Sequence, residues 1–277
     1  MKKNKLATWI CRACMILVSF IFIYPLFWNL MSSFKSNTEF LTDPFSFSKN
    51  MAWDNYARAF VKANMGKYFF NSVYVVIVGL LCTLVLCIPV GYVLARYKFK
   101  GAKFLMSVLV CCLFIHPTYI MVPLFLQLNT FHMLDNLSAL SLVYAVFRIP
   151  FSVFLLVGFL KGVSRSYEEA AQLDGCTRIR ILWSVIVPIA KPGIVTVAML
   201  SAMAYWNEYP LALVLIQSDK KRTLPIGLAN LYEVQQYATD WGALFAALII
   251  VLVPTIIIYM FGQRHLIEGA SMGGVKE

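Results

Sequence analysis

Two ionisable residues, Arg148 and Glu208, lie inside long apolar stretches of the sequence. An isolated charge at the centre of a bilayer costs at least about 2.5–3.5 kcal/mol, so such side chains usually face protein or water and have partners. With a rise of about 1.5 Å per helical residue, both lie roughly 12–14 Å from the outer ends of their stretches. Their similar depth predicts a direct ion pair or a shared polar cavity. The simpler alternatives are that Arg148 snorkels or that one stretch begins later.

A second group of residues has the chemistry of a small-molecule site, where aromatic faces and a few hydrogen-bonding groups line a largely preformed cavity. Its members are Trp206, Asn207, Glu208 and Tyr209, together with His116 and Tyr119 beside Pro117. Trp206 and Tyr209 are three residues apart and would share one face of a helix. Tryptophan and tyrosine also form interfacial belts and contacts between spans, which is the simpler interpretation.

Other chemistries are missing from the sequence. It contains no G-x-x-x-x-G-K-[ST] phosphate loop, no G-x-S-x-G motif and no H-E-x-x-H motif. Cys11 and Cys14 have C-x-x-C spacing, but no second pair or nearby histidine supports a metal or redox site. His116, His132 and His265 are far apart in the chain. The sequence therefore predicts no catalytic residue, metal or cofactor on this chain and argues against a membrane enzyme.

The elements that position these residues follow from composition. Of the 277 residues, 60% are hydrophobic and 13% are charged, whereas soluble domains carry about 45–50% and about 25%. A helix of about 20 residues crosses a bilayer, and backbone groups in lipid must be satisfied internally. Six apolar stretches are long enough, at approximately 13–31, 72–95, 104–126, 139–160, 194–216 and 241–262. We therefore expect an all-α membrane protein with six transmembrane helices in a single domain, 1–277.

The placement of lysine and arginine predicts the orientation of the spans. The N-terminal residues, the loop 96–103, the stretch 161–193 and the C-terminal tail carry most of the 24 basic residues. Basic loops stay in the cytoplasm, so both termini are expected there. The formal net charge of +11 is thus a topology signal and does not indicate nucleic-acid binding. The first apolar stretch is too long for a signal peptide and lacks an A-x-A-like site, so it is expected to remain as the first helix.

Two connections are expected on the external side. Residues 32–71 form the longest connection, and a segment of that length usually has some structure of its own. Residues 217–240 carry the charged run Asp219-Lys220-Lys221-Arg222 near their start. This second connection is either a solvated turn or a surface that touches an external partner.

The cytoplasmic stretch 161–193 begins with a predicted short helix. Ser164 or Ser166 would cap it, and Glu168 and Glu169 would lie in its first turn. Gly175 would take the positive φ that ends the helix.

A second short helix is expected from Thr177 to about Val187, before Pro188 and Pro192. The two helices would lie at the inner membrane surface. By periodicity alone, an ordinary amphipathic surface loop is the favoured interpretation of this stretch.

A motif in the same stretch gives it a more specific meaning. Glu169-Ala170-Ala171 is followed by Gly175 and then by Pro188, with the spacing EAA-x3-G-x12-P. This pattern resembles the EAA loop of ABC-importer permeases. Further segments resemble the carbohydrate-uptake branch of that family, similar to the second maltose-type inner-membrane permease. They are Asn71-Ser72, Ala95-Arg96-Tyr97, Trp206-Asn207-Glu208 and Thr223-Leu224-Pro225. Two positions depart from the family pattern: Val185 stands where the family usually has isoleucine, and Cys176 stands where it more often has alanine.

The resemblance implies a type I ABC-importer permease fold in the cytoplasmic membrane of a bacterium. Separate ATPase subunits would bind ATP and Mg²⁺, and their closure would move the EAA helix and swing the spans from inward-open to outward-open. The residues implied in this coupling are Glu169, Ala170, Ala171, Asp174, Gly175 and Pro188. The other implied partners are membrane lipid, a homologous permease, expected to form a heterodimer, and an external sugar-binding protein. The expected cargo is a sugar or oligosaccharide.

The alternative function is that of a stand-alone ion-coupled secondary transporter. Arg148, Glu208 and His116 would then form a proton or ion relay, whereas in the importer they would belong to the substrate pathway. No inverted repeat relates the two halves of the sequence, as is common in such transporters. The cytoplasmic helix pair would also have no explanation, so the sequence favours the importer.

Overall fold

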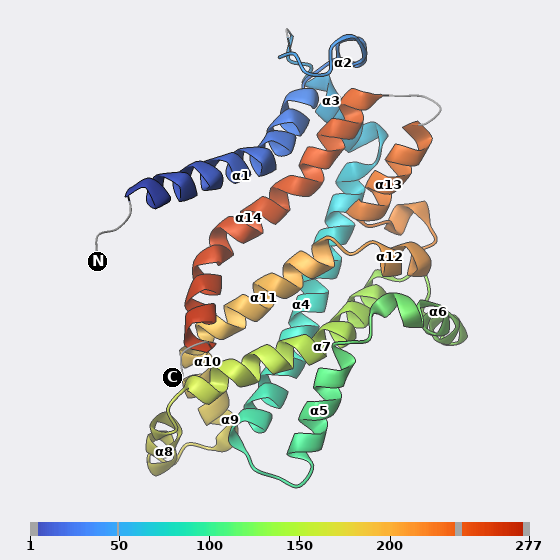
Figure 1. Ribbon diagram of the computed structural model, residues 1–277. Coiled ribbons are helices and arrows are strands. Elements are labelled where there is room, and N and C mark those ends of the chain that lie inside the picture. The colour runs from blue at the N-terminus through green and yellow to red at the C-terminus, as the bar shows by residue number, and fades with distance from the viewer. Residues whose placement is uncertain (1–4, 49, 236–239, 274–277) are drawn as a thin grey trace. The chain divides into compact units, whose positions relative to one another are not determined.

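The computed structural model describes residues 5–48, 50–235 and 240–273, and every regular element in these ranges is helical (Figure 1). The prediction of an all-α protein is therefore confirmed. Four of the described helices are long and apolar enough to cross a membrane, and there are six candidate spans if each of two bent helix pairs counts as one. Residues 1–4 and 274–277, whose charges contribute to the predicted orientation, lie outside the described residues.

The chain divides into two compact units. The first comprises residues 1–66 and 227–253, and the second comprises residues 67–226 and 254–277. Two compact units can belong to one membrane domain, so the single domain 1–277 stays a prediction. In chain order the helices are α1 (Lys5–Ser32), α2 (Asn37–Thr42), α3 (Asp54–Ala57), η1 (Arg58–Lys62), α4 (Met65–Arg96), α5 (Ala102–Cys112), η2 (Pro117–Ile120), α6 (Met121–Thr130), α7 (Leu137–Gly162), α8 (Ser166–Leu173), α9 (Arg178–Ile181), η3 (Leu182–Ile186), α10 (Val187–Ile189), α11 (Lys191–Trp206), α12 (Pro210–Leu215), η4 (Asp219–Lys221), α13 (Leu224–Gln235) and α14 (Trp241–Gly273).

In the first unit, aromatic side chains pack the end of α1 against α2 and the beginning of α14. The ring centroids of Trp28 and Phe245 lie 5.3 Å apart, and Phe40 lies 4.9 Å from Phe245. Such pairs contribute about 0.5–1.5 kcal/mol beyond the burial of their area. The apolar part of α1 is not buried within the chain, which suits a helix that faces lipid.

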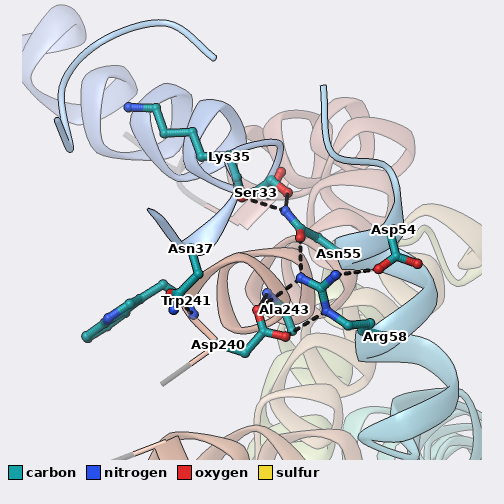
Figure 2. Close-up of polar contacts among 9 residues, drawn as sticks. All are labelled: Ser33, Lys35, Asn37, Asp54, Asn55, Arg58, Asp240, Trp241 and Ala243. Carbon is teal, nitrogen blue, oxygen red and sulfur yellow. Dashed lines mark hydrogen bonds and ion pairs between the residues drawn. The ribbon is translucent and has the colours of Figure 1, made fainter. Parts of the chain in front are cut away.

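A polar network holds the connection after α1 in place, as Figure 2 shows. Arg58 donates two hydrogen bonds to Asp240, of 2.7 and 3.1 Å, and also pairs with Asp54. The buried Asn55 accepts from Arg58 at 2.6 Å and donates to the carbonyl of Lys35 at 2.8 Å. The prediction that this connection has structure of its own is confirmed, because it contains α2, α3 and η1.

The helix α7 contributes to both apolar clusters of the second unit. Its first half provides Leu140 and Tyr144 to one cluster, and its second half provides Val153 and Leu160 to the other. Residues of α4 and α11 also belong to both clusters. A helix with neighbours on several sides needs an apolar surface all round, which is why α7 shows no amphipathic pattern.

Two of the six predicted stretches are interrupted helices. The stretch 104–126 divides into α5 and a segment that begins at Pro117, and the two parts are bent by 91°. His116 is extended because the residue before a proline disfavours the helical region.

The stretch 194–216 is interrupted as well. The helix α11 ends at Trp206, and α12 begins at Pro210. Proline suits the first position of a helix because it has no N–H group that would remain unpaired there. The other four predicted stretches lie within α1, α4, α7 and α14. The connection 217–240 contains η4 and α13, which the sequence pattern did not indicate.

Candidate functional site

The EAA segment forms a short helix, α8, that ends as predicted. Glu168 and Glu169 lie in its first turn. The predicted serine cap is wrong: Arg165 holds the capping position without a side-chain cap, and Ser164 Oγ accepts from the backbone N–H of Ser166 at 3.3 Å before the helix. Gly175 has φ +77°. Its N–H donates to the carbonyl of Gln172, and the next N–H, of Cys176, donates to the carbonyl of Ala171, both at 3.0 Å. These two bonds form a Schellman motif, in which glycine is favoured at the left-handed position.

The second predicted helix is also present. Thr177 caps α9 by accepting from the N–H of Arg180 at 3.4 Å, and the helical conformation continues through η3 and α10 to Ile189. It therefore extends two residues past the predicted end, and Pro188 lies within its last turn. The chain then bends by 78° into α11.

The residues of the EAA motif differ in exposure. Glu169, Ala170, Asp174, Gly175 and Pro188 are exposed, whereas Ala171 is buried and faces the core. The sequence analysis did not single out Leu173 and Ile179, which flank the turn and are 90% and 73% exposed. Large apolar side chains that are exposed around a polar turn are typical of a surface that contacts a partner. The sequence did contain a signal for them, because both are large apolar residues close to the glycine of the turn.

A cavity of about 620 Å³ lies in the second unit. Its walls come from the connection between α5 and η2, from the middle of α7, and from the end of α11 with the residues that follow it. Three of the predicted site residues, His116, Arg148 and Glu208, line it.

The other four predicted residues do not line this cavity. Trp206 is buried against Phe69, with ring centroids 5.5 Å apart, and Asn207 is exposed and donates to a carbonyl of its own helix. Tyr209 packs beside the apolar cluster that contains Leu211, and Tyr119 is exposed next to the ring of His116. The structure thus separates the predicted set into cavity-lining residues and residues that pack or face outward.

Arg148 and Glu208 share the cavity without forming an ion pair among the described residues. Arg148 donates to Ser201 Oγ at 3.3 Å and to the carbonyl of Leu200 at 3.0 Å. Its guanidinium carbon also lies 4.2 Å from the ring centroid of Phe151, a cation–π geometry. Of the two predicted arrangements, the structure has the shared polar cavity.

Glu208 is held by three donors. Its carboxylate accepts from the hydroxyl of Tyr144 and from the N–H groups of Leu211 and Ala212, the latter two at 2.8 and 3.0 Å. A carboxylate at the beginning of a helix satisfies N–H groups that lack partners and favours the positive end of the helix dipole. Glu208 therefore fixes the broken segment between α11 and α12.

Two tyrosines of the cavity were missed by the sequence analysis. Tyr144 and Tyr205 stack with ring centroids 5.6 Å apart, and Tyr205 shares a hydrogen bond of 2.6 Å with Thr83 of α4. Tyr144 precedes Arg148 by four residues, so the two occupy one face of a helix. That spacing could have identified Tyr144 as a neighbour of Arg148. The contact between Tyr205 and Thr83 could not be predicted in this way, because the two residues are far apart in the chain.

The loop between α12 and α13 is fixed by Asp135. Its carboxylate accepts from the N–H groups of Gln217 and Ser218, from the hydroxyl of Ser218, and from Lys221 Nζ, at 2.9 to 3.2 Å. On the other side of the loop, the amide of Asn71 donates to two carbonyls, at 3.1 and 2.9 Å. The basic tip of this loop is therefore held in a defined conformation.

This anchor predicts a dependence on pH. Burial raises the pKa of Asp135, but the hydrogen bonds from Ser218 and Lys221 outweigh it, so that its pKa is lower than usual. Because the folded pKa is depressed, the stabilisation is complete above the ordinary value of about 4 and is lost as the pH falls through the folded pKa. We expect Asp135→Asn to reduce the free energy of unfolding by about 1 kcal/mol at pH 7.

Thermal unfolding of the wild type and of Asp135→Asn in detergent, measured from pH 7 down to 3, tests this prediction. The difference between the two midpoints should shrink as the pH falls from about 4 through the lowered pKa of the folded carboxylate, because the wild-type carboxylate then becomes protonated too. A difference that stays constant over the range would contradict the role of the ionised carboxylate.

The chain is similar to known transport proteins over most of its length. The sequence model of the family described as "Binding-protein-dependent transport system inner membrane component" matches residues 87–270. The diacetylchitobiose uptake system permease protein NgcG of Streptomyces coelicolor is 38% identical over 264 residues, which are 95% of this chain and 87% of that protein. The probable starch degradation products transport system permease protein AmyC of Thermoanaerobacterium thermosulfurigenes is 33% identical over 95% of this chain and 94% of that protein.

A solved structure has a similar fold. It is the crystal structure of a bacterial ABC transporter involved in the import of the acidic polysaccharide alginate. One of its chains matches this chain with a TM-score of 0.83 and 21% identity, over 95% of this chain and 98% of that one. At this level of identity the likeness concerns the fold alone.

Proposed function

Since the chain belongs to the family of binding-protein-dependent transport system inner membrane components, we propose that it is the permease subunit of an ABC importer for a sugar or oligosaccharide. The observation that carries the proposal is the family match over 87–270, which includes both the EAA helix pair and the cavity. The names of the relatives, which concern diacetylchitobiose and starch degradation products, support a carbohydrate as cargo.

Energy for the transport comes from separate ATPase subunits in this proposal. They bind ATP and Mg²⁺, because this sequence has no phosphate loop of its own. The exposed residues Glu169, Ala170, Asp174 and Gly175 form the docking surface, with Leu173 and Ile179 as its apolar part. Buried Ala171 supports α8 from the core side, and exposed Pro188 extends the surface along α10.

The proposed subunit crosses the bacterial cytoplasmic membrane six times, with both termini in the cytoplasm. The four long apolar helices, the bent pair Ala102–Cys112 with Pro117–Thr130, and α11, the Lys191–Trp206 half of the other bent pair, support these six crossings. The distribution of lysine and arginine supports the orientation. The connections 32–71 and 217–240 then face outwards, where they would meet an external sugar-binding protein, and a homologous permease completes the pore as a heterodimer.

The cavity of the second unit is the proposed part of the substrate pathway in this subunit. Aromatic rings of Tyr144 and Tyr205 and the polar groups of His116, Arg148 and Glu208 provide the stacking and hydrogen bonding that sugars need. Trp206, Asn207, Tyr209 and Tyr119 support these walls or extend the pathway outside the cavity. An ion relay through His116, Arg148 and Glu208 is not favoured, because the family match indicates a transporter with partner subunits.

Purification of the tagged chain from its native membrane tests the proposal. We expect a permease and an ATPase to co-purify, and the complex in proteoliposomes to take up labelled diacetylchitobiose or maltooligosaccharides only with ATP and a binding protein. If the chain purifies alone and transports in response to an ion gradient without ATP, the ion-coupled carrier replaces the importer.

A further inference from the structure

A buried ion pair joins the end of α4 to the first turn of α8 in the second unit. Arg96 Nε lies 2.6 Å from Glu168 Oε1, and the two side chains are only 5% and 11% exposed. Tyr92 donates its hydroxyl to the other carboxylate oxygen at 3.3 Å, and Arg96 donates to the carbonyl of Val163 at 2.9 Å. The carbonyl of Arg96 accepts from Arg165 at 3.3 Å. These contacts connect the last turn of α4 with the first turn of α8 and with the connection that precedes it.

The two adjacent acids of α8 have different surroundings. Successive residues of a helix are rotated by about 100°, since 3.6 residues make a turn. Glu168 therefore faces the core while Glu169 is exposed. In α8, all of which is described, Glu168 and Ala171 are the buried residues. Because alanine buries little area, the ion pair is the main attachment of this helix to α4.

We propose that the Arg96–Glu168 pair transmits the displacement of α8 to α4 during the transport cycle. This inference rests on the proposed function, in which the ATPase moves α8. Separating a buried pair leaves two uncompensated charges, so a force on α8 moves the end of α4 with it. A helix of eight residues is not stable alone in water, so α8 keeps its fold through its contacts with the rest of the unit, the ion pair among them.

The helix α4 provides a continuous path from this pair to the cavity. It is one helix from Met65 to Arg96, with Pro89 inside it between the ion pair and Thr83. Thr83 shares the 2.6 Å hydrogen bond with Tyr205 of the cavity wall. A shift at Arg96 is thereby passed to the hydroxyl of a residue that lines the substrate pathway. Arg96 and Glu168 are positioning residues, since neither of them lines the cavity.

The complex purified with its ATPase from the native membrane provides the test, with sugar transported per ATP hydrolysed as the measurement. Labelled diacetylchitobiose and maltooligosaccharides serve as probes. We expect Glu168→Gln to keep the ATPase bound and hydrolysing while sugar per ATP falls by about tenfold. The double variant Arg96→Met with Glu168→Leu leaves no unpaired buried charge, so it should fold and show the same loss.

Lys98→Gln is the matched control, because Lys98 is an exposed cation two residues from Arg96; its ratio of sugar to ATP should equal that of the wild type. A wild-type ratio in the apolar double variant would overturn the proposal, since ordinary packing would then suffice. Loss of the ATPase from both Glu168→Gln and the double variant would overturn it too, because the pair would only maintain the fold of α8. Failure of the proposed function would look different from failure of this inference, because the wild-type complex itself would then show no ATP-driven uptake.

Discussion

Gly175→Arg is expected to lower both the association of the ATPase and ATP-driven uptake by more than about tenfold. Gly175 has φ +77°, and most side chains in the left-handed region cost roughly 1–2 kcal/mol. A difference of about 1.4 kcal/mol is tenfold in an equilibrium constant. Nothing lies within 4 Å of a Cβ built at this position, so the cost arises from the backbone and not from a clash inside the chain. The arginine side chain then projects from the exposed turn and obstructs the proposed docking surface.

Two further substitutions separate the conformation from the obstruction. Gly175→Asn places a residue that tolerates the left-handed region in the same turn, so it should retain most of the ATPase association. Gly101→Arg is the matched control, because Gly101 also has a positive φ, of +98°, and open space around its Cβ, but lies before α5. It should carry a comparable backbone cost and still bind the ATPase.

Co-purification of the ATPase with the tagged chain, followed by uptake in proteoliposomes, measures these effects. Equal losses for Gly175→Arg and Gly101→Arg would mean that the substitution acts through folding in general. Full association and uptake with Gly175→Arg would contradict the assignment of the EAA turn as the docking surface.

The turn at Gly175 shows what the sequence reveals reliably. Its helix, its glycine cap and the Thr177 cap depend on residues within a few positions of one another, and local rules for caps are enough to predict them. Glu168 and Glu169 show the limit of such rules. Both are acids in the first turn of one helix, and the buried one, Glu168, pairs with Arg96, which lies 72 residues earlier in the chain.

The cavity shows a second limit. Hydropathy over a window of about 20 residues identifies apolar length but is insensitive to a single proline. The breaks before Pro117 and Pro210 were therefore missed, although each proline was visible in the sequence. These breaks place His116 and Glu208 in the wall of the cavity. The chemistry of the residues was predicted, and the irregular backbone that exposes them was not.

Arg148→Met is expected to reduce ATP-driven uptake by about 10- to 100-fold, because hydrogen bonds to a charged group contribute about 1.5–3 kcal/mol. The described contacts of Arg148 are to a hydroxyl, a carbonyl and the face of Phe151, and none of them is a carboxylate. A guanidinium carries five N–H donors in a planar fork. Donors therefore remain for the oxygen atoms of a sugar in the cavity.

Methionine replaces the unbranched, flexible stem of the arginine side chain, whereas it removes the charge, the donors and the guanidinium contact with Phe151. Arg148→Lys keeps the charge but loses the fork. If the charge alone matters, the lysine variant should transport like the wild type, and if paired hydrogen bonds matter, it should resemble the methionine variant.

Association of the ATPase should be unchanged in both variants, because α8 and its turn lie outside the cavity wall. The discriminating measurement is uptake against sugar concentration.

A loss of contacts to bound sugar raises the concentration needed for half-maximal uptake, whereas a loss of interactions made only in the translocation transition state lowers the maximal rate. Unchanged uptake in Arg148→Met would remove this cavity from the substrate pathway. A different result would favour the ion-coupled carrier. If uptake by the wild type persists without ATP but stops when an ionophore dissipates the ion gradient, Arg148, Glu208 and His116 are its relay. The shared cavity alone fits both mechanisms, and it is the requirement for ATP that separates them.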